Sequence, residues 1–380
     1  MRTTGTTGAI GTRLEQLRGA LPTRNHNART VAALAANPGC ARRGVLDAAG
    51  IEKSELAARL GFPARYGRSP FAIGRGNVFE ARVKADGGRE LRRLLAETLG
   101  ADPDGGPLVD VEGPHARPTR EERVTRTRAA VASAASGGPD ACAILDHPLL
   151  PLDVAGQSAY LEPDAMACRV GGRLYVVEIK SFAIIDGSAD PGKLASAARQ
   201  AAVCVLALRR LARELGFDQD IVATDVVLVC ARDFSNRPVA AVLDVRRELA
   251  TATRRLDRLA DVEDLFAALP EGITFDVGPE GSADQLGDRV GQVSAAYVPD
   301  CLSACELALY CRSEARACGS GGTVGTLGTS VRGALGGIAD IGTAIALADG
   351  TREPTPDEAD TARLLRRAQA LRREVLGDAA

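Results

Sequence analysis

The feature that most constrains the fold is a pair of apolar segments, LEPDAMACRV (161–170) and RLYVVEIKSF (173–182), separated by Gly171-Gly172. Short apolar segments on either side of a glycine pair are typical of a β-hairpin. Acidic residues and a lysine interrupt these otherwise apolar strands. The hairpin therefore predicts a sheet that carries charged side chains at one point along its length.

Three further strands and a long helix surround the hairpin. ACAILDHPLL (141–150) indicates a short buried strand, and TDVVLVCAR (224–232) and PVAAVLDV (238–245) indicate two more. KLASAARQAAVCVLALRRLARELG (193–216) has the apolar spacing of a helix. The order helix, strand, hairpin, helix, strand predicts an α/β protein with a mixed sheet flanked by helices.

We expect five segments along the chain. The last helix of the C-terminal segment begins at a capping box, Thr355-Pro356-Asp357-Glu358. In order, the segments are a mobile basic N-terminus (1–30), an N-terminal helical segment with Cys40 (31–73), an α/β core (74–270), a linker with a cysteine-rich segment (271–320) and a C-terminal helical tail (321–380). The prediction is one α/β core with helical extensions at both ends.

The composition excludes several classes of protein. Apolar residues make up 45% of the chain and charged residues 25%, which is the ordinary mix of a globular protein. No stretch approaches about twenty apolar residues, so we expect no membrane span. The first thirty residues lack the apolar region of a secretory signal. We therefore expect a cytoplasmic protein in a reducing compartment, where its nine cysteines do not form a disulfide framework.

Arginine supplies almost all of the basic charge. The chain has 43 arginines and 4 lysines, a net charge of −2 and no tryptophan. Contact with DNA would depend on arginine rather than on base stacking, because aromatic residues are scarce. Arginine-rich helical stretches lie at 120–128, 246–258 and 363–373. They could contact phosphates, but their interleaved acidic residues are also typical of solvated helix faces.

The geometry of the hairpin decides whether its charged residues meet. Glu178 and Lys180 are two residues apart in one strand, so their side chains share a face. A two-residue turn would place Asp164 on the opposite face, whereas a three-residue turn at 171–173 would pair it with Lys180. We predict the three-residue turn, or a bulge near Pro163 that has the same effect.

Two carboxylates and a lysine in one buried place indicate a metal site. A buried charge needs a partner or a metal, and Mg²⁺ and Mn²⁺ take oxygen ligands such as carboxylates. Such an ion lowers the pKa of bound water and neutralises charge on a phosphate. A nearby lysine can orient the attacking water and stabilise the charge that develops. The alternative is a structural Asp–Lys–Glu ion network at the edge of the sheet.

Asp164, then Glu178-Ile179-Lys180, then a helix with Gln200 resembles the core of the PD-(D/E)xK nucleases, in particular their RecB-like branch. That branch has an upstream helix that begins with a glycine followed by a metal-binding His or Glu, and Gly76–Glu80 fits it. The branch also has a tyrosine four residues after the glutamine, where this chain has Cys204. The resemblance implies a restriction-endonuclease-like core. It implies catalytic roles for Glu80, Asp164, Glu178, Lys180 and Gln200, and a Mg²⁺ or Mn²⁺ ion held by Glu80, Asp164, Glu178 and Ile179.

The cysteines carry a second pattern. Cys301-x3-Cys305-x5-Cys311 follows the core and Cys40 precedes it, an arrangement that resembles the iron–sulfur site of RecB-like nucleases such as the CRISPR-associated exonucleases and the AddB subunit. The resemblance implies a 4Fe–4S cluster held by Cys40, Cys301, Cys305 and Cys311. Zn²⁺ is the alternative metal for four thiolates, and Cys318 is a fifth candidate ligand. Because Cys311 lies six residues beyond Cys305, the chain must bend between them to close the site.

The two resemblances imply one function, with one alternative. The implied activity is that of a divalent-metal-dependent deoxyribonuclease, of exonuclease type, with DNA as substrate and protein partners in a repair or defence complex. The alternative is a catalytically inactive, metal-stapled module that binds DNA or a partner. Cys204 at the tyrosine position favours this alternative, as does Glu80 at a position that can be His. Glu80 is also spaced for an ordinary helical ion pair with Lys84.

Overall fold

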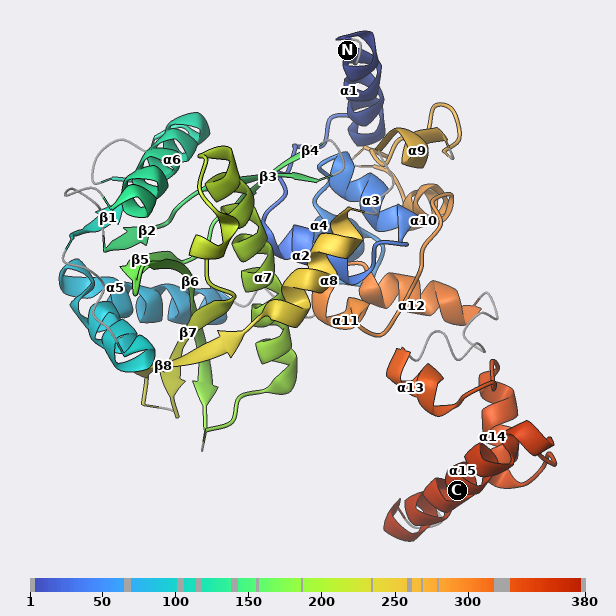
Figure 1. Ribbon diagram of the computed structural model, residues 1–380. Helices are drawn as coiled ribbons and strands as arrows, with labels where there is room; N and C mark the ends of the chain where they lie inside the picture. Colours follow the sequence, from blue (N-terminus) through green and yellow to red (C-terminus); the bar gives the residue numbers. More distant parts are fainter. Residues whose placement is uncertain are drawn as a thin grey trace. The chain divides into compact units, whose positions relative to one another are not determined.

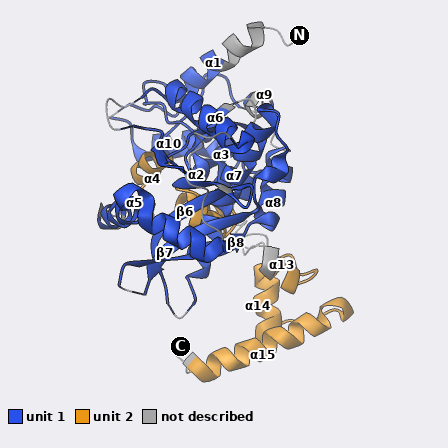
Figure 2. Ribbon diagram, turned by 60° about the vertical axis from the view of Figure 1, so that its left-hand side comes forward, with its two compact units in different colours: residues 1–52, 65–294 blue, residues 53–64, 295–380 orange. Residues whose placement is uncertain are grey.

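The computed structural model describes most of the chain. The described residues are 4–64, 70–100, 106–113, 118–137, 143–154, 157–185, 187–233, 235–257, 262–267, 269–278, 280–317 and 329–376. The chain divides into two compact units, Met1–Glu52 with Arg65–Ser294 and Lys53–Ala64 with Ala295–Ala380 (Figure 2). The first unit contains the β-sheets described below.

A mixed six-stranded sheet forms the centre of the first unit (Figure 1). Its order is β1-β2-β5-β6-β7-β8, where β1 pairs parallel with β2 and β6 with β7, and the other neighbours are antiparallel. The strands are β1 Leu108–Asp110, β2 Ile144–Asp146, β5 Ala165–Val170, β6 Arg173–Ile184, β7 Asp225–Arg232 and β8 Arg237–Asp244, and a separate ribbon pairs β3 Leu150–Val154 with β4 Gln157–Leu161. The predicted mixed α/β architecture is confirmed, with its hairpin (β5–β6) and its two later strands. Strands β1, β3 and β4 were not predicted.

The described helices of the first unit are α1 Thr4–Arg18, α2 Ala28–Ala36, α3 Ala41–Ala48, α5 Pro70–Leu99 with a non-helical kink at 85–88, α6 Arg120–Ser136, α7 Pro191–Glu214, α8 Arg246–Leu256, α9 Val262–Ala267 and α10 Ala283–Gly291, with a 3-10 turn at Gln219–Ile221. Two of them, α5 and α7, cover opposite faces of the sheet. Helix α5 packs on the face that carries Ile179 of β6, and α7 packs on the face that carries Val176. Because side chains alternate along a strand, Glu178 and Lys180 belong to the α7 face.

The β5–β6 turn differs from the prediction. Val170 pairs with Arg173, so Gly171 and Gly172 form a two-residue turn, with φ of 58° and 78°. Glycine adopts this left-handed conformation without strain, which explains the glycine pair. The three-residue turn was therefore wrong. The pairing shifts by one residue between Ala167 and Val170, a bulge at the turn end of β5 rather than near Pro163.

The bulge has the effect that the longer turn was expected to have. Beyond it, Ala165 lies opposite Val177, and the same register continued by one residue places Asp164 opposite Glu178. Residues directly opposite each other in an antiparallel pair share a face. Asp164, Glu178 and Lys180 therefore lie on one face of the sheet.

The N-terminal thirty residues contain more structure than predicted. The prediction was a mobile segment, whereas α1 occupies Thr4–Arg18 and α2 begins at Ala28. Leu17, near the end of α1, is fully buried, and its carbonyl accepts a 2.8 Å hydrogen bond from the Phe275 amide. This contact joins residues about 260 positions apart, so no local pattern could predict it.

The described part of the second unit is helical. Its helices are α4 Lys53–Arg59, α11 Cys301–Ala304, α12 Ala308–Ala317, α13 Thr329–Ala334, α14 Ile341–Asp349 and α15 Ala359–Leu376, with a 3-10 turn at Pro356–Glu358. The predicted capping box is present, because Thr355 and Glu358 each bond the other's backbone. Helices α14 and α15 share a small core that includes Leu347 and Ala362. No helix within the described ranges of the chain is both long and apolar enough to cross a bilayer.

Candidate active site

Three charged residues of the β5–β6 hairpin meet at one point. The Nζ atom of Lys180 lies 2.6 Å from Oε2 of Glu178 and 3.0 Å from Oδ2 of Asp164. The backbone amide of Ile179 donates a 2.6 Å hydrogen bond to the same Asp164 oxygen. The Glu178 side chain is only 5% exposed. The structure thus brings Asp164, Glu178 and Lys180 together at the start of β5, where one ammonium bridges two carboxylates.

The electrostatics of this group raise the pKa of Glu178 towards neutral pH. Burial raises the pKa of Glu178 to about 7; the Lys180 ammonium opposes this shift, and the charges of Asp164 and Glu80 add to it. For Lys180, burial would lower the pKa, but the two carboxylates outweigh it and raise the pKa. Lys180 therefore stays charged at neutral pH. The effect of Glu80 on Glu178 places Glu80 within electrostatic reach of the group.

Glu80 lies on α5 in a second cluster of charges. Its Oε1 pairs with Nζ of Lys84 and lies 3.3 Å from Nε2 of His147. Nζ of Lys84 also lies 2.5 Å from Oδ1 of Asp146. Burial would raise the pKa of Glu80, but hydrogen bonds from His147 and Lys84 lower it to about 2. The expected Glu80–Lys84 ion pair is present, and it is part of a larger network.

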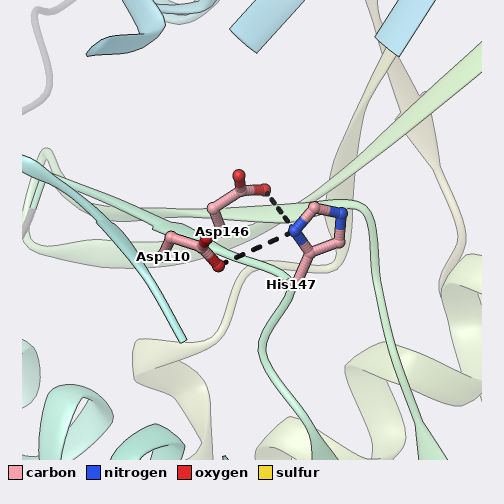
Figure 3. Close-up of side chains that lie close together, drawn as sticks. All are labelled: Asp110, Asp146 and His147. Carbon is pink, nitrogen blue, oxygen red and sulfur yellow. Dashed lines mark ion pairs between the residues drawn. The ribbon is translucent and has the colours of Figure 1, made fainter. Parts of the chain in front are cut away.

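Asp110, Asp146 and His147 complete this network (Figure 3). Asp110 ends β1 and Asp146 ends β2, and the two are register partners in the parallel pair, so their side chains emerge side by side. Nδ1 of His147 lies 3.4 Å from Oδ1 of Asp146 and 3.9 Å from Oδ1 of Asp110. The sequence prediction did not include these residues. The sequence contained one indication of this site, the Asp-His pair at the end of a buried strand. It was not enough to predict the site, because the partner strand β1, which carries Asp110, was not recognised.

Gln200 and Cys204 lie on α7, the helix that covers the triad's face of the sheet. Nε2 of Gln200 donates a 3.3 Å hydrogen bond to Oγ of Ser196 within the same helix. Cys204 is fully buried; burial raises the pKa of its thiol, and the negative charge of Glu178 adds to the shift. The position expected for a tyrosine therefore faces the charged group, whereas the described bond of Gln200 stays within its helix.

The cysteine segment bends as the spacing requires. Helix α11 begins at Cys301 and ends before Cys305, whose backbone is extended (φ −121°, ψ 129°), and Cys311 is buried in the following helix α12. Cys40 occupies the N-cap position of α3 in the first unit, without a side-chain capping hydrogen bond. The fifth candidate, Cys318, lies outside the described residues.

The arginine-rich stretches are largely engaged in intramolecular contacts. Arg123 of α6 pairs with Glu112 and Glu162, and Arg255 of α8 donates to the carbonyl groups of Ala35 and Ala36. Such contacts are typical of structural or solvated helix faces rather than of phosphate-binding sites.

A different group of arginines lines a hollow of about 630 Å³ between α5 and the edge strand β8. Its charged lining residues are Arg82, Glu90, Arg93, Glu97, Arg232 and Arg237. The four arginines are scattered through the sequence, which explains why no charge run predicted them.

Comparisons with known proteins add little to this geometry. Neither the family models nor the curated proteins give a match. Among solved structures, the chain is similar to one described as "Crystal structure of SSO0001", with a TM-score of 0.24 and 14% identity over 68% of this chain and 88% of that chain. A likeness this distant indicates neither a family nor an activity. The candidate function therefore depends on the side-chain geometry.

Proposed function

We propose that the chain is a divalent-metal-dependent nuclease that hydrolyses phosphodiester bonds in DNA, built on a PD-(D/E)xK-type core. One observation carries the proposal: Lys180 bridges Asp164 and Glu178 on one face of the sheet, with Glu80 close enough to raise the pKa of Glu178. These are the residue types, in the same order along the chain, that the sequence resemblance requires.

The donor set fits Mg²⁺ or Mn²⁺. Glu178 is buried beside two other acids, and at a pKa of about 7 it holds a proton for part of the time at neutral pH. A hard divalent cation would take the place of that proton, because carboxylate oxygens are its preferred ligands. Glu80, Asp164, Glu178 and the Ile179 carbonyl would hold the ion, which, when bound, acidifies a water and neutralises phosphate charge.

The protein groups around this position supply orientation and positive charge. Lys180 keeps its proton and holds both carboxylates with two of its three N–H bonds. The third N–H bond can point to a phosphate oxygen or to the attacking water. The Ile179 amide fixes the rotamer of Asp164. Lys84 and His147 hold Glu80 in its ionised form. The site is therefore organised before substrate arrives.

Cleavage of DNA tests the proposal. The full-length chain is incubated with single-stranded, double-stranded and circular DNA in Mg²⁺ or Mn²⁺, beside Lys180→Ala and Lys193→Ala. Lys193 is the matched control, because it is an exposed lysine at the start of α7. Loss of the charged donor lowers the cleavage rate by about a hundredfold to a thousandfold in Lys180→Ala, and Lys193→Ala cleaves like wild type. Full activity in a folded Lys180→Ala variant would end the catalytic assignment.

We also propose that Cys301, Cys305 and Cys311 bind a 4Fe–4S cluster in a reducing cytoplasm; Cys40 is the fourth ligand that the sequence resemblance implies. The extended backbone at Cys305, which ends α11 before the helix that carries Cys311 begins, supports the cysteine trio. Anaerobically purified protein is expected to be brown, with about four irons and four sulfides per chain, and Cys305→Ser to lose most of this iron. Colourless protein that contains zinc instead would favour the tetrahedral Zn²⁺ site.

A second candidate function is a DNA- or partner-binding module without turnover. The observation that favours it lies on α7, where Cys204 takes the tyrosine position and the Gln200 amide is bonded to Ser196. This candidate predicts that wild-type protein and Lys180→Ala bind DNA, or a repair or defence protein, with equal affinity. It also predicts no cleavage with either metal.

A further inference from the structure

The imidazole of His147 lies beside two carboxylates, those of Asp110 and Asp146, that could bind a metal ion together with it. Its Nδ1 atom is buried and forms no hydrogen bond with any residue in the described part of the chain, although it faces the carboxylates of Asp110 and Asp146 (Figure 3). A buried ring nitrogen that faces two oxygens without a hydrogen bond requires an explanation. A cation between the three groups would supply one.

The other ring nitrogen of His147 supports this interpretation. Nε2 lies 3.3 Å from Oε1 of Glu80 and also 3.3 Å from Nζ of Lys84, and in the tautomer with its proton on Nε2 the ring donates to Glu80. A carboxylate that accepts the Nε2 proton leaves the lone pair of a neutral imidazole on Nδ1. This carboxylate–histidine arrangement is the usual second shell of a histidine that binds a metal.

The distances agree with the geometry of a small coordination site. Metal–ligand bonds of about 2.1 Å at tetrahedral angles place neighbouring ligand atoms about 3.4 Å apart. Nδ1 of His147 lies 3.4 and 3.9 Å from the Asp146 and Asp110 oxygens, and the three ligand atoms all lie within 4.8 Å of one another. These separations are too long for hydrogen bonds of good geometry, but they suit three ligands of one ion.

The Asp146 carboxylate already binds a cation in this structure. Nζ of Lys84 lies 2.5 Å from its Oδ1 atom and 3.3 Å from Nε2 of His147. An ion that binds here shares Asp146 with Lys84, so its binding has to outweigh repulsion by this ammonium.

We propose that Asp110, Asp146 and His147 bind a divalent transition-metal ion, with Glu80 orienting the histidine, at a position separate from the Asp164–Glu178 pair. One imidazole nitrogen and two carboxylates suit Mn²⁺ or Zn²⁺ better than Mg²⁺, because imidazole is a poor ligand for the hard magnesium ion. This site goes beyond the proposed nuclease and stands without it. Glu80 is the residue common to both sites.

The test uses Mn²⁺ as probe and electron paramagnetic resonance as readout. The full-length chain without added histidines is titrated with Mn²⁺, and electron spin echo envelope modulation detects nitrogen coupled to the bound ion. The proposed nuclease ligands are all oxygens, so nitrogen coupling reports on His147. The variants are His147→Asn, Asp110→Asn, Asp164→Asn and the control Asp244→Asn. Asparagine suits position 147, whose φ is +47°, and Asp244, like Asp110, is a partly exposed aspartate at a strand end.

The expected results separate this site from the nuclease centre. Wild type, Asp164→Asn and Asp244→Asn show nitrogen coupling, and His147→Asn does not. Asp110→Asn binds this Mn²⁺ about tenfold or more weakly, whereas Asp244→Asn stays within about twofold of wild type. Absence of nitrogen coupling in wild type, its persistence in His147→Asn, or unchanged affinity in Asp110→Asn would overturn the proposal. A protein that shows the coupling but cleaves no DNA would refute only the nuclease.

Discussion

Glu80 and Glu178 occupy opposite electrostatic environments, although each carboxylate pairs with a lysine. Glu80 receives hydrogen bonds from both His147 and Lys84, which lower its pKa to about 2. Glu178 is fully enclosed beside Asp164, so its pKa rises to about 7 despite the charge of Lys180. Two carboxyl groups whose environments separate their pKa values in this way are typical of sites that bind and move protons or metals.

The raised pKa of Glu178 predicts a specific dependence of stability on pH. The folded chain holds a proton that the unfolded chain releases near pH 4.5, so this contribution to the free energy of unfolding is complete below pH 4.5 and is lost as the pH rises through about 7. In EDTA, wild type should therefore lose up to about 3 kcal/mol relative to Glu178→Gln between pH 4.5 and pH 8. Urea unfolding of both proteins measures the difference. An equal pH dependence in both would contradict the buried, protonated carboxyl, and Glu374→Gln, an exposed residue, serves as control.

At the scale of the elements, local pattern and long-range pairing contributed differently to what the sequence could predict. The hairpin and α7 follow from apolar spacing and glycine position, and both were predicted, whereas the bend between Cys305 and Cys311 was predicted from the cysteine spacing. A bulge was offered as an alternative near Pro163, but its position between Ala167 and Val170 was not predicted, because the identity of the residues at 168–169 does not mark it. Strand β1 has three residues and no periodicity, so Asp110 could not be placed beside Asp146. The shared face of Asp164 and Glu178 was expected from a longer turn or from a bulge near Pro163, and it arises from a bulge at the other end of β5.

The glycine turn that sets the register of the hairpin can be tested directly. Gly172 has a φ of +78°, and a side chain there would meet no neighbour within 4 Å, so the cost of a substitution comes from the backbone alone. Gly172→Ala should lower the free energy of unfolding by about 1–2 kcal/mol. Gly39→Ala is the control, because that position also has open space but lacks a left-handed φ, and it should be neutral or slightly stabilising. Equal effects in the two variants, measured by urea unfolding, would mean that the turn does not require glycine.

At the scale of the whole molecule, the net charge is −2, so long-range attraction would not bring the proposed DNA substrate to the protein. The proposed function therefore requires local positive charge. The hollow between α5 and β8 offers four arginines against two glutamates. Arg93 is already paired with both Glu90 and Glu97, and Arg82 donates to the Asn236 carbonyl. Arg232 and Arg237, which are register partners in β7 and β8, are exposed and therefore the best placed for phosphates.

The double variant Arg232→Gln/Arg237→Gln should therefore bind DNA more weakly. Each arginine that contacts a phosphate releases about one counterion, so we expect the Kd to rise about tenfold near 100 mM salt. The slope of log affinity against log salt should become shallower by about two. Fluorescence anisotropy in EDTA measures binding without cleavage. The matched control is Arg363→Gln/Arg372→Gln on α15, which removes the same charge from exposed positions of a helix in the other compact unit. An equal loss of affinity in both double variants would show that only total charge matters. An unchanged slope in Arg232→Gln/Arg237→Gln would show that DNA does not contact the hollow.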